Sequence, residues 1–408
     1  MNAPVKWLRR SGPRLPGFLA DRIAVPFNWQ TGEHRIAAVL GDDVPPPDAV
    51  MMQSNDYLSL ARDPRIGLAK SRALLRQGHG DAVSRVFTHG RDDAHHRFER
   101  RMADLLGTES AVLCMSGYSA NVGLIQTFAG PETPVYIDKM AHASLWEGIL
   151  SSGATPTVFA HNDTTDLQTK IAAGGPGLIL VDALYSQNGS LCPLRAMVEI
   201  AEATGCALVV DETHSFGCHG VDGAGLCVAL GLAERVHFRT IGLSKAMTAR
   251  GGIVAGPREA MTFLRYEARP MIFSTSVLGY EVAGFEAVLD ILRDDPWRRF
   301  RLAENHRALR IGLAKLGYDV SRSDSQIISI LIGSDDDTVA FRRALVAAGV
   351  VGSVFCSPAV PKDQAIIRLT VNAGMDTEDI DKVLSAFEAL KDMPRRKDER
   401  SEYAQLTS

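Results

Sequence analysis

Short apolar stretches alternate with segments of helical periodicity over most of this chain. Each stretch is rich in β-branched residues and bounded by Gly, Pro or Asp, which is typical of buried strands. The seven stretches are 111–115, 134–138, 156–160, 177–182, 206–211, 236–241 and 252–256. Helical patterns such as 194–204 lie between most of them. This alternation predicts an α/β domain with a mostly parallel seven-stranded sheet and helices on both faces.

The pattern changes near residue 291. A long amphipathic stretch has apolar positions from Trp297 to Leu316 and stops at Gly317. The signals that follow are strand 325–333, helix 338–348, strand 350–355, strand 365–371 and helix 377–391. They predict a smaller C-terminal α+β domain. We therefore predict an N-terminal segment (1–50), a large domain (51–290), a small domain (291–393) and a polar tail (394–408).

Composition and charge narrow the class of protein. A chain of 408 residues with 46% hydrophobic content can bury a large core. A net charge of -4 and a pI near 6.3 give no reason to expect nucleic-acid binding, which depends on clustered Lys and Arg. The basic residues near the start (Lys6, Arg9, Arg10 and Arg14) precede no long apolar run, so we expect neither a secretory signal nor a membrane span. The charged tail is expected to be disordered or loosely attached.

The cysteines are scattered along the chain without a CxxC pair or a Cys/His spacing of the metal-binding type. They are Cys114, Cys192, Cys206, Cys218, Cys227 and Cys356. We therefore expect reduced thiols in a cytoplasmic protein, with no structural disulfide and no metal site.

Polar residues at strand ends are the first candidates for chemistry, because ligands of open parallel sheets bind outside the carboxyl ends of the strands. Asp182 and Asp211 each end a predicted strand, and Ser244 and Lys245 follow another. An acid at a strand end and a lysine 34 positions later fit a pyridoxal 5′-phosphate (PLP) enzyme. The carboxylate would keep the pyridine nitrogen protonated, and the amine would form a Schiff base. Alternatively, Asp211 caps a helix and Lys245 is a surface lysine.

Neighbouring residues add to this hypothesis, although each also has an ordinary structural explanation. Ser116 and Gly117 form a small-residue turn before a predicted helix at 121–128, which could bind a phosphate or be a common turn. His142 could stack on a flat cofactor ring or be a buried, hydrogen-bonded histidine. His214, three residues after Asp211, could bond the ring hydroxyl or be structural.

Two further segments carry polar groups suited to anions. The string at 273–276, FSTS, offers hydroxyls for a phosphate and is also ordinary turn chemistry. Arg368 lies in an otherwise apolar strand, IIRLTV, so a buried guanidinium there needs a partner. A substrate carboxylate would form a bidentate pair with the guanidinium, and an internal salt bridge is the alternative.

Taken in order, these motifs resemble the α-oxoamine synthase family, which has fold type I of the PLP-dependent transferases. The motifs are SNDYLSLA (54–61), SGYSAN (116–121), HAS (142–144), DETHSFGCHGVDGAGL (211–226), TIGLSKA (240–246), FSTS (273–276) and IIRLTVNA (366–373). The resemblance extends from about residue 50 to about residue 390. It implies condensation of an amino acid with an acyl-CoA thioester, usually with loss of carbon dioxide.

Other strings are similar to one group within that family, the α-hydroxyketone autoinducer synthases of bacterial quorum sensing. They are QSNDYLSLA (53–61), NVGLIQT (121–127), VYIDKMAHASLWEG (135–148), GPGLILVDALYS (175–186), HGVDGAGL (219–226), VHFRT (236–240) and GSVFCSPA (352–359). The segment between Gly78 and Glu99 departs from both this group and the broader family. For this group the resemblance implies a medium-chain acyl-CoA, with S-adenosylmethionine or 2-aminobutyrate as amino donor.

The resemblance also implies roles for individual residues. Lys245 forms the Schiff base and acts as general base, Asp211 pairs with the pyridinium, His142 stacks on the ring, and His214 reaches the ring hydroxyl. Further cofactor contacts are implied for Ser116, Gly117, Tyr118, Ser186, Thr240 and Ser244. Ser274 and Thr275 would reach the phosphate of the partner chain in a homodimer. Asn55 and Arg368 would face the substrate carboxylate.

Three alternatives stay open. A housekeeping α-oxoamine synthase, for example one of biotin synthesis, would use the same chemistry with another donor. An aminotransferase of the same fold would need no thioester. A noncatalytic protein of this fold would lack the lysine, whereas Lys245 is present here.

Overall fold

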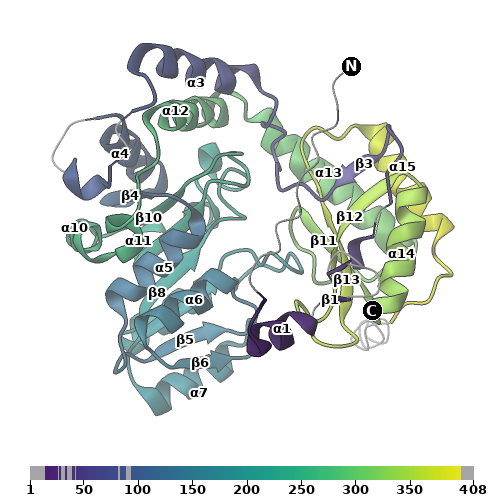
Figure 1. Ribbon diagram of the computed structural model, residues 1–408, viewed down its shortest axis with the longest axis horizontal. Helices are drawn as coiled ribbons and strands as arrows, with labels where there is room; N and C mark the ends of the chain where they lie inside the picture. Colours follow the sequence, from purple (N-terminus) through teal and green to yellow (C-terminus); the bar gives the residue numbers. More distant parts are fainter. Residues whose placement is uncertain are drawn as a thin grey trace.

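The computed structural model describes residues 14–25, 27–28, 33–34, 39–41, 43–80, 83–88 and 93–396. Within them the chain forms a large and a small sheet, each packed against helices, and a two-stranded pair (Figure 1). The predictions for Lys6, Arg9 and Arg10, and for 397–408, lie outside the described residues, as do parts of the 78–99 segment.

The large sheet has the predicted form. Its order is β4 (Ser110–Cys114), β10 (Gly252–Gly256), β9 (Phe238–Gly242), β8 (Ala207–Asp211), β7 (Leu178–Asp182), β5 (Val135–Asp138) and β6 (Pro156–Phe159). Strands β5 to β9 run parallel, and β10 is antiparallel to both of its neighbours. The α/β class and the mostly parallel seven-stranded sheet are therefore confirmed.

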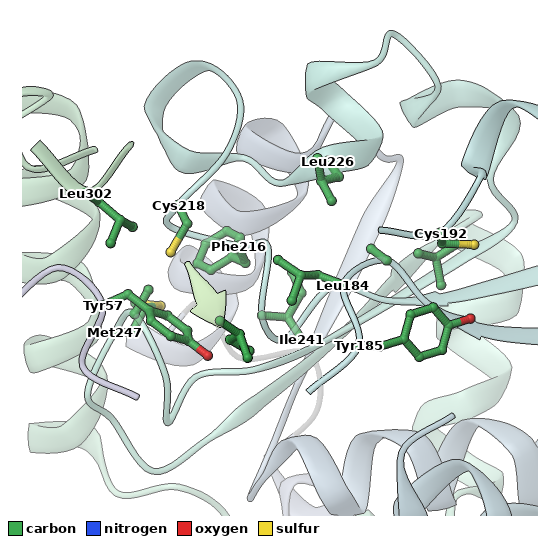
Figure 2. Packing of buried hydrophobic residues seen from close by; sticks show 14 of the residues in the cluster. Tyr57, Leu184, Tyr185, Cys192, Phe216, Cys218, Leu226, Ile241, Met247 and Leu302 are labelled. Atoms are coloured by element: carbon green, nitrogen blue, oxygen red, sulfur yellow. The ribbon is translucent and has the colours of Figure 1, made fainter. Parts of the chain in front are cut away.

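Alternate residues of each central strand pack on opposite faces of the sheet, because successive side chains of a strand point in opposite directions. In β7, Leu178 and Leu180 belong to one apolar cluster, and Ile179 and Val181 belong to the other. The first cluster includes residues of α5 (Gly117–Phe128), α6 (Ala143–Ser152) and α10 (Arg258–Glu267). The second includes residues of α4 (Ala94–Leu106), α7 (Thr164–Gly174), α8 (Leu194–Thr204) and α12 (Gly279–Asp294). Figure 2 shows part of the second cluster, including Tyr57, Phe216 and Met247.

The smaller sheet lies beside the large one (Figure 1). Its order is β11 (Ile327–Gly333), β13 (Ala365–Thr370), β12 (Val350–Phe355) and β3 (Val50–Met52), and its helices are α13 (Trp297–Lys315), α14 (Asp335–Ala347) and α15 (Thr377–Ala389). Strand β3 pairs in parallel with β12, so residues 51 and 52 lie in the small sheet although the predicted boundary gave them to the large domain. Strand β3 is far in sequence from the rest of the small sheet, so the sequence around it does not indicate which sheet it joins. The domain boundaries by residue number stay a prediction.

The remaining elements connect these layers. They are α1 (Gly17–Ala24), β1 (Phe27–Asn28), β2 (Glu33–His34), α3 (Pro64–Gln77), α9 (Leu226–Ala229), α11 (Arg269–Ile272) and short 3-10 turns at Arg85–Phe87, Val221–Gly223 and Ala233–Arg235. All six cysteines are buried free thiols. In the described part of the chain, no helix has the length and apolar character needed to cross a membrane.

Candidate active site

A cavity of about 620 Å³ lies at the carboxyl ends of β5, β7, β8 and β9. Nine of the residues predicted from the sequence line it: Asn55, Ser116, Gly117, Tyr118, His142, Asp211, His214, Ser244 and Lys245. The carboxyl ends of the parallel large-sheet strands meet at one edge, which is why residues from Ser116 to Lys245 meet here, whereas Asn55 comes from the segment after β3.

Asp211 is the last residue of β8 and is nearly fully buried. Its Oδ1 accepts a hydrogen bond from the backbone N–H of Thr213 at 2.8 Å, and its Oδ2 accepts one from Nδ2 of Asn121 at 2.6 Å. The turn that follows is held by a fully buried ion pair between Glu212 and Arg239. A donor on each oxygen fixes the orientation of the carboxyl group at the end of the strand.

Lys245 lies three residues beyond β9 and faces the same cavity. Burial lowers the pKa of its ammonium group, the charge of Arg368 lowers it further, and Asp211 acts in the opposite direction. Among the described residues, no group accepts a hydrogen bond from its Nζ at a distance below 3.5 Å. A lysine with a lowered pKa and an unengaged amine is suited to imine formation and to proton abstraction.

The N-terminus of α5 forms another wall of the cavity. Ser116 caps this helix by a reciprocal pair of hydrogen bonds with Ser119, and Gly117 is its first residue. A Cβ atom at Gly117 would lie 2.6 Å from Cα of Gly242, so only glycine allows this close approach to β9. The first N–H groups of a helix lack partners within it, and they attract anions. This turn is therefore suited to a phosphate.

His142 is the N-cap residue of α6. Its backbone N–H donates to Oδ1 of Asp182 at 3.2 Å, and its Nδ1 lies 2.7 Å from Oγ of Ser144. Burial raises the pKa of Asp182 well above the ordinary value, and the charge of neighbouring Asp211 adds to this. The backbone of His142 is therefore bound to the acid that ends β7, and its ring is held by Ser144.

His214 is buried, and its Nδ1 lies 2.6 Å from the hydroxyl oxygen of Tyr57. Burial lowers the pKa of this imidazole well below its ordinary range, with further lowering by the charges of Lys245 and Arg368. Its backbone carbonyl accepts a hydrogen bond from Nε2 of Gln326, which fixes the turn against the small domain. His214 is thus held as an uncharged ring.

Arg368 lies on β13 outside the cavity lining and bonds to Asn55, which is part of that lining. Its Nη2 donates to Oδ1 of Asn55 at 2.6 Å, and its Nη1 donates to the carbonyl of Ser186 at 2.8 Å. Burial lowers the pKa of the guanidinium. In the part of the chain that the structure describes, no carboxylate forms an ion pair with Arg368, and its Nε is buried without a partner. The predicted alternative of an internal salt bridge is therefore wrong for these residues.

Five predicted residues do not line the cavity: Ser186, Thr240, Ser274, Thr275 and Arg368. Ser186 contributes its backbone carbonyl to Arg368. Thr240 pairs with Asp211 in the register of β8 and β9 and is fully buried. Ser274 and Thr275 follow α11, and their predicted contact with the phosphate of a partner chain stays a prediction.

Comparisons with known proteins identify the family of this chain. The model of the family described as aminotransferase class I and II matches residues 47–387. The chain belongs to this family. The CAI-1 autoinducer synthase of Vibrio campbellii is 41% identical over 382 residues, which cover 93% of this chain and 96% of that protein. The 8-amino-7-oxononanoate synthase of Anaeromyxobacter dehalogenans is 35% identical over 348 residues, or 85% of this chain and 87% of that protein.

A solved structure of serine palmitoyltransferase from S. paucimobilis, with a bound PLP–myriocin aldimine, has a TM-score of 0.79 and 29% identity. It covers 84% of this chain and 87% of that one. Within the aminotransferase class I and II family, the resemblance to α-oxoamine synthases and to autoinducer synthases is therefore confirmed.

For this aminotransferase class I and II member, the sequence pattern left several cavity residues without a role. Asn121, Ser144 and Thr213 line the cavity. Tyr57 lies outside the lining, and its hydroxyl contacts Nδ1 of His214, which is part of the lining. Asn121 could have been found, because it is a polar residue in the apolar pattern of 121–128. Nothing in the local sequence distinguishes Tyr57 from an ordinary core tyrosine.

Proposed function

We propose that this protein is a PLP-dependent acyltransferase that condenses an amino donor with an acyl-CoA thioester, releasing CoA thiol and carbon dioxide. The observation that carries this proposal is the meeting of Lys245 and Asp211 in one cavity at the strand ends. The family match and the similarity to α-oxoamine synthases support it.

The residues of the cavity fit PLP. Asp211 has both carboxylate oxygens held by donors and would face the pyridinium nitrogen. The turn at Ser116 and Gly117, with Ser244, would hold the phosphate, and Lys245 would hold the aldehyde carbon. His142 would lie against the ring. When bound, PLP supplies an electron sink that stabilises negative charge at the α-carbon of the donor.

The protein's own groups then bind the donor and move its proton. Lys245 would remove the proton from the donor α-carbon, since its lowered pKa makes the amine a usable base closer to neutral pH. Asn55 and Arg368 would bind the donor carboxylate, because the guanidinium has an unpartnered Nε and Asn55 connects it to the cavity. His214, uncharged, would donate to the ring hydroxyl from the nitrogen that does not face Tyr57.

For the substrates, we infer a medium-chain acyl-CoA with S-adenosylmethionine or 2-aminobutyrate as donor. The product would be an α-aminoketone, the precursor of an α-hydroxyketone signal in quorum sensing. The support is the 41% identity to a protein named CAI-1 autoinducer synthase. A second candidate is the reaction of the 8-amino-7-oxononanoate synthases, which are similar over most of this chain at lower identity.

We also propose a homodimer in which Ser274 and Thr275 of one chain reach the phosphate site of the other. Both residues follow α11, outside the cavity of their own chain, and Phe273 beside them is 81% exposed. An exposed aromatic side chain next to two hydroxyls suits a surface that a second chain covers.

The test begins with the cofactor. Wild-type protein with PLP should be yellow, and Lys245→Ala should lose the visible absorption band, whereas Lys139→Ala, which changes an exposed lysine outside the cavity, should keep it. A colourless wild type would contradict the proposal.

Donor and acceptor are then varied together, with release of CoA thiol as the readout. Thiol release with S-adenosylmethionine or 2-aminobutyrate and a medium-chain acyl-CoA is expected. Turnover only with alanine and a pimeloyl thioester would assign the biotin-type reaction instead. Amino transfer without thiol release would indicate an aminotransferase.

A further inference from the structure

We propose that Asn121 is a positioning residue that joins Asp211 and His142 into one hydrogen-bonded unit on the cofactor side of the cavity. This inference rests on the proposed PLP function. The unit consists of Asp211 at the end of β8, Asn121 on α5, and Ser144 and His142 at the start of α6. All four residues line the cavity.

The amide of Asn121 is the centre of the unit. Its Nδ2 donates to Oδ2 of Asp211 at 2.6 Å and to Oγ of Ser144 at 2.8 Å, so both of its hydrogens are engaged. The carboxylate of Asp211 can only accept when ionised, so the nitrogen and not the oxygen of the amide must face it. Asn121 is 1% exposed, which removes competing water.

Ser144 carries the connection to His142. Its Oγ accepts from Asn121, which leaves its O–H free to donate to Nδ1 of His142 at 2.7 Å. The backbone N–H of Ser144 also points at this Nδ1, at 3.3 Å. A backbone N–H only donates, so Nδ1 is an acceptor and the ring's hydrogen is on Nε2. The backbone N–H of Ser144 thus sets the tautomer of the histidine, and Asn121 holds the Ser144 hydroxyl that orients the ring.

Packing of α5 against α6 makes this connection short. At Gly148 of α6, a Cβ atom would lie 2.7 Å from Cδ1 of Ile125 and 3.2 Å from the carbonyl oxygen of Asn121. Glycine therefore lets the two helices approach closely enough for Ser144 to reach the Asn121 side chain. This contact joins a residue of α5 to the first turn of α6, directly after its N-cap residue His142.

A polar group left without a partner points to a role beyond packing. The Oδ1 of Asn121 is buried and has no hydrogen-bond partner among the described residues. A buried amide with an unsatisfied oxygen is unfavourable, and an apolar side chain would fill this space without that cost. Asn121 is therefore explained by its two donated hydrogen bonds.

The surroundings of Asp211 make a donor there necessary. The titratable and charged groups that face it are Asp182 on β7, His142 before α6, His214 in the following turn and Lys245 after β9. Asp182 lies directly across the strand register, and its pKa is raised well above the ordinary value, mainly by burial. The hydrogen bond from Asn121 supplies Oδ2 of the buried Asp211 with a donor in these surroundings.

The first test is Asn121→Leu, which removes both donors while keeping a similar volume. The expected result is an apparent PLP dissociation constant about 10-fold to 100-fold higher than in wild type, since a hydrogen bond to a charged group is lost. The control is Asn305→Leu. Asn305 is also a buried asparagine with both Nδ2 hydrogens donated, to the carbonyls of Asn372 and Met375, and it does not line the cavity. This control should lower the melting temperature and leave the PLP affinity unchanged.

The second test is Asn121→Asp, measured as PLP affinity against pH. The introduced carboxylic acid can donate to Asp211 only while it holds a proton. Affinity should therefore fall more steeply with rising pH than in wild type, and a purely structural role of Asn121 would not produce this slope. Ser144→Ala removes the Oγ link between Asn121 and His142 and keeps the bond from Asn121 to Asp211, so it should give a smaller loss than Asn121→Leu.

The outcomes separate the two proposals. A wild type that binds no PLP overturns the proposed function. A wild type that binds PLP, together with an Asn121→Leu protein of unchanged affinity, overturns the role of Asn121. If Asn121→Leu does not fold, an unchanged pH profile for Asn121→Asp and an unchanged affinity for Ser144→Ala overturn it equally.

Discussion

The two ends of the cavity are constructed in different ways. The ring end, defined as Asp211, Asn121, Ser144 and His142, comes from one sheet and the two helices on one of its faces. The carboxylate end, defined as Asn55, Tyr57 and Arg368, comes from a segment after β3 and from β13 of the small sheet. The geometry of the ring end therefore depends only on the folding of the large sheet and these two helices. The carboxylate end depends on how the two sheets are placed against each other.

This difference assigns different tasks to the two ends. Hydrogen bonds of the ring end fix a carboxylate and an imidazole relative to each other, as a cofactor site requires. Nε of Arg368 has no hydrogen-bond partner among the residues that the structure describes, as a site for an incoming anion requires. Changes at the ring end should thus affect the cofactor, and changes at the carboxylate end should affect the amino donor.

The largest effect is expected for Asp211→Asn, which removes the charge of the ring end and nearly preserves its shape. We expect kcat to fall about a hundredfold to a thousandfold, as for the loss of one preorganised electrostatic group. The Michaelis constant for the acyl-CoA should change little. Thiol release under saturating substrates measures this, and a kcat within a few-fold of wild type would contradict the assignment of the ring end.

Arg368→Lys tests the carboxylate end. Lysine keeps the charge and loses the planar fork, so the Michaelis constant for the amino donor should rise about 10-fold to 100-fold. The PLP affinity should stay that of wild type, because Arg368 lies outside the cavity wall. Equal losses of donor and PLP affinity would mean that the two ends are not separate.

His214 lies between the two ends and should make stability depend on pH. Its pKa in the folded protein is well below 6.5, so below that pH the unfolded chain binds a proton that the folded chain does not. The free energy of unfolding of the cofactor-free protein should therefore decrease as the pH falls below that value, by up to about 1.4 kcal/mol per pH unit for this group. In His214→Gln the pH dependence should be flatter. Chemical denaturation between neutral and acid pH measures both proteins, and identical slopes would exclude His214 as the cause.

The smallest effect is expected for Tyr57→Phe, which removes one buried hydroxyl beside Nδ1 of His214. Unfolding should become easier by about 1 kcal/mol, and the donor affinity should decrease slightly. Tyr136→Phe is the matched control, since Tyr136 is also fully buried and its hydroxyl donates to the carbonyl of Gly175 far from the cavity wall. It should lose similar stability and leave the donor affinity unchanged. If both variants lower the donor affinity equally, Tyr57 has no specific link to the carboxylate end.

Much of the fold could be predicted from local patterns. The strand that ends at Asp211 and the helix at 194–204 were predicted where the structure has them, because burial on both faces leaves apolar, β-branched runs and an exposed helix face leaves a period. The edge strand β3 could not be assigned to the small sheet, because its partner β12 lies about three hundred positions away and pairing is made by the backbone.

The site divides in the same way. Lys245, Asp211, His142 and His214 could be found because their chemistry is rare at strand ends and their motifs have a recognisable order. Asn121 and Tyr57 could not be given roles, because each acts through a partner that only folding brings near. Arg368 could be found because it is a charged residue in an apolar strand. Its hydrogen bond to Asn55, which lines the cavity, is known only from the structure.

By itself the sequence determined which side chains can do chemistry and which stretches become strands, because both depend on residue type and spacing along the chain. Only the tertiary structure decided which hydrogen bonds hold those side chains. It decided which oxygen of Asp211 faces Asn121 and which nitrogen of His142 carries the hydrogen. It also decided that the guanidinium of Arg368 donates to Asn55. The physical reason is that hydrogen bonds are short and directional, so their partners are set by packing in three dimensions.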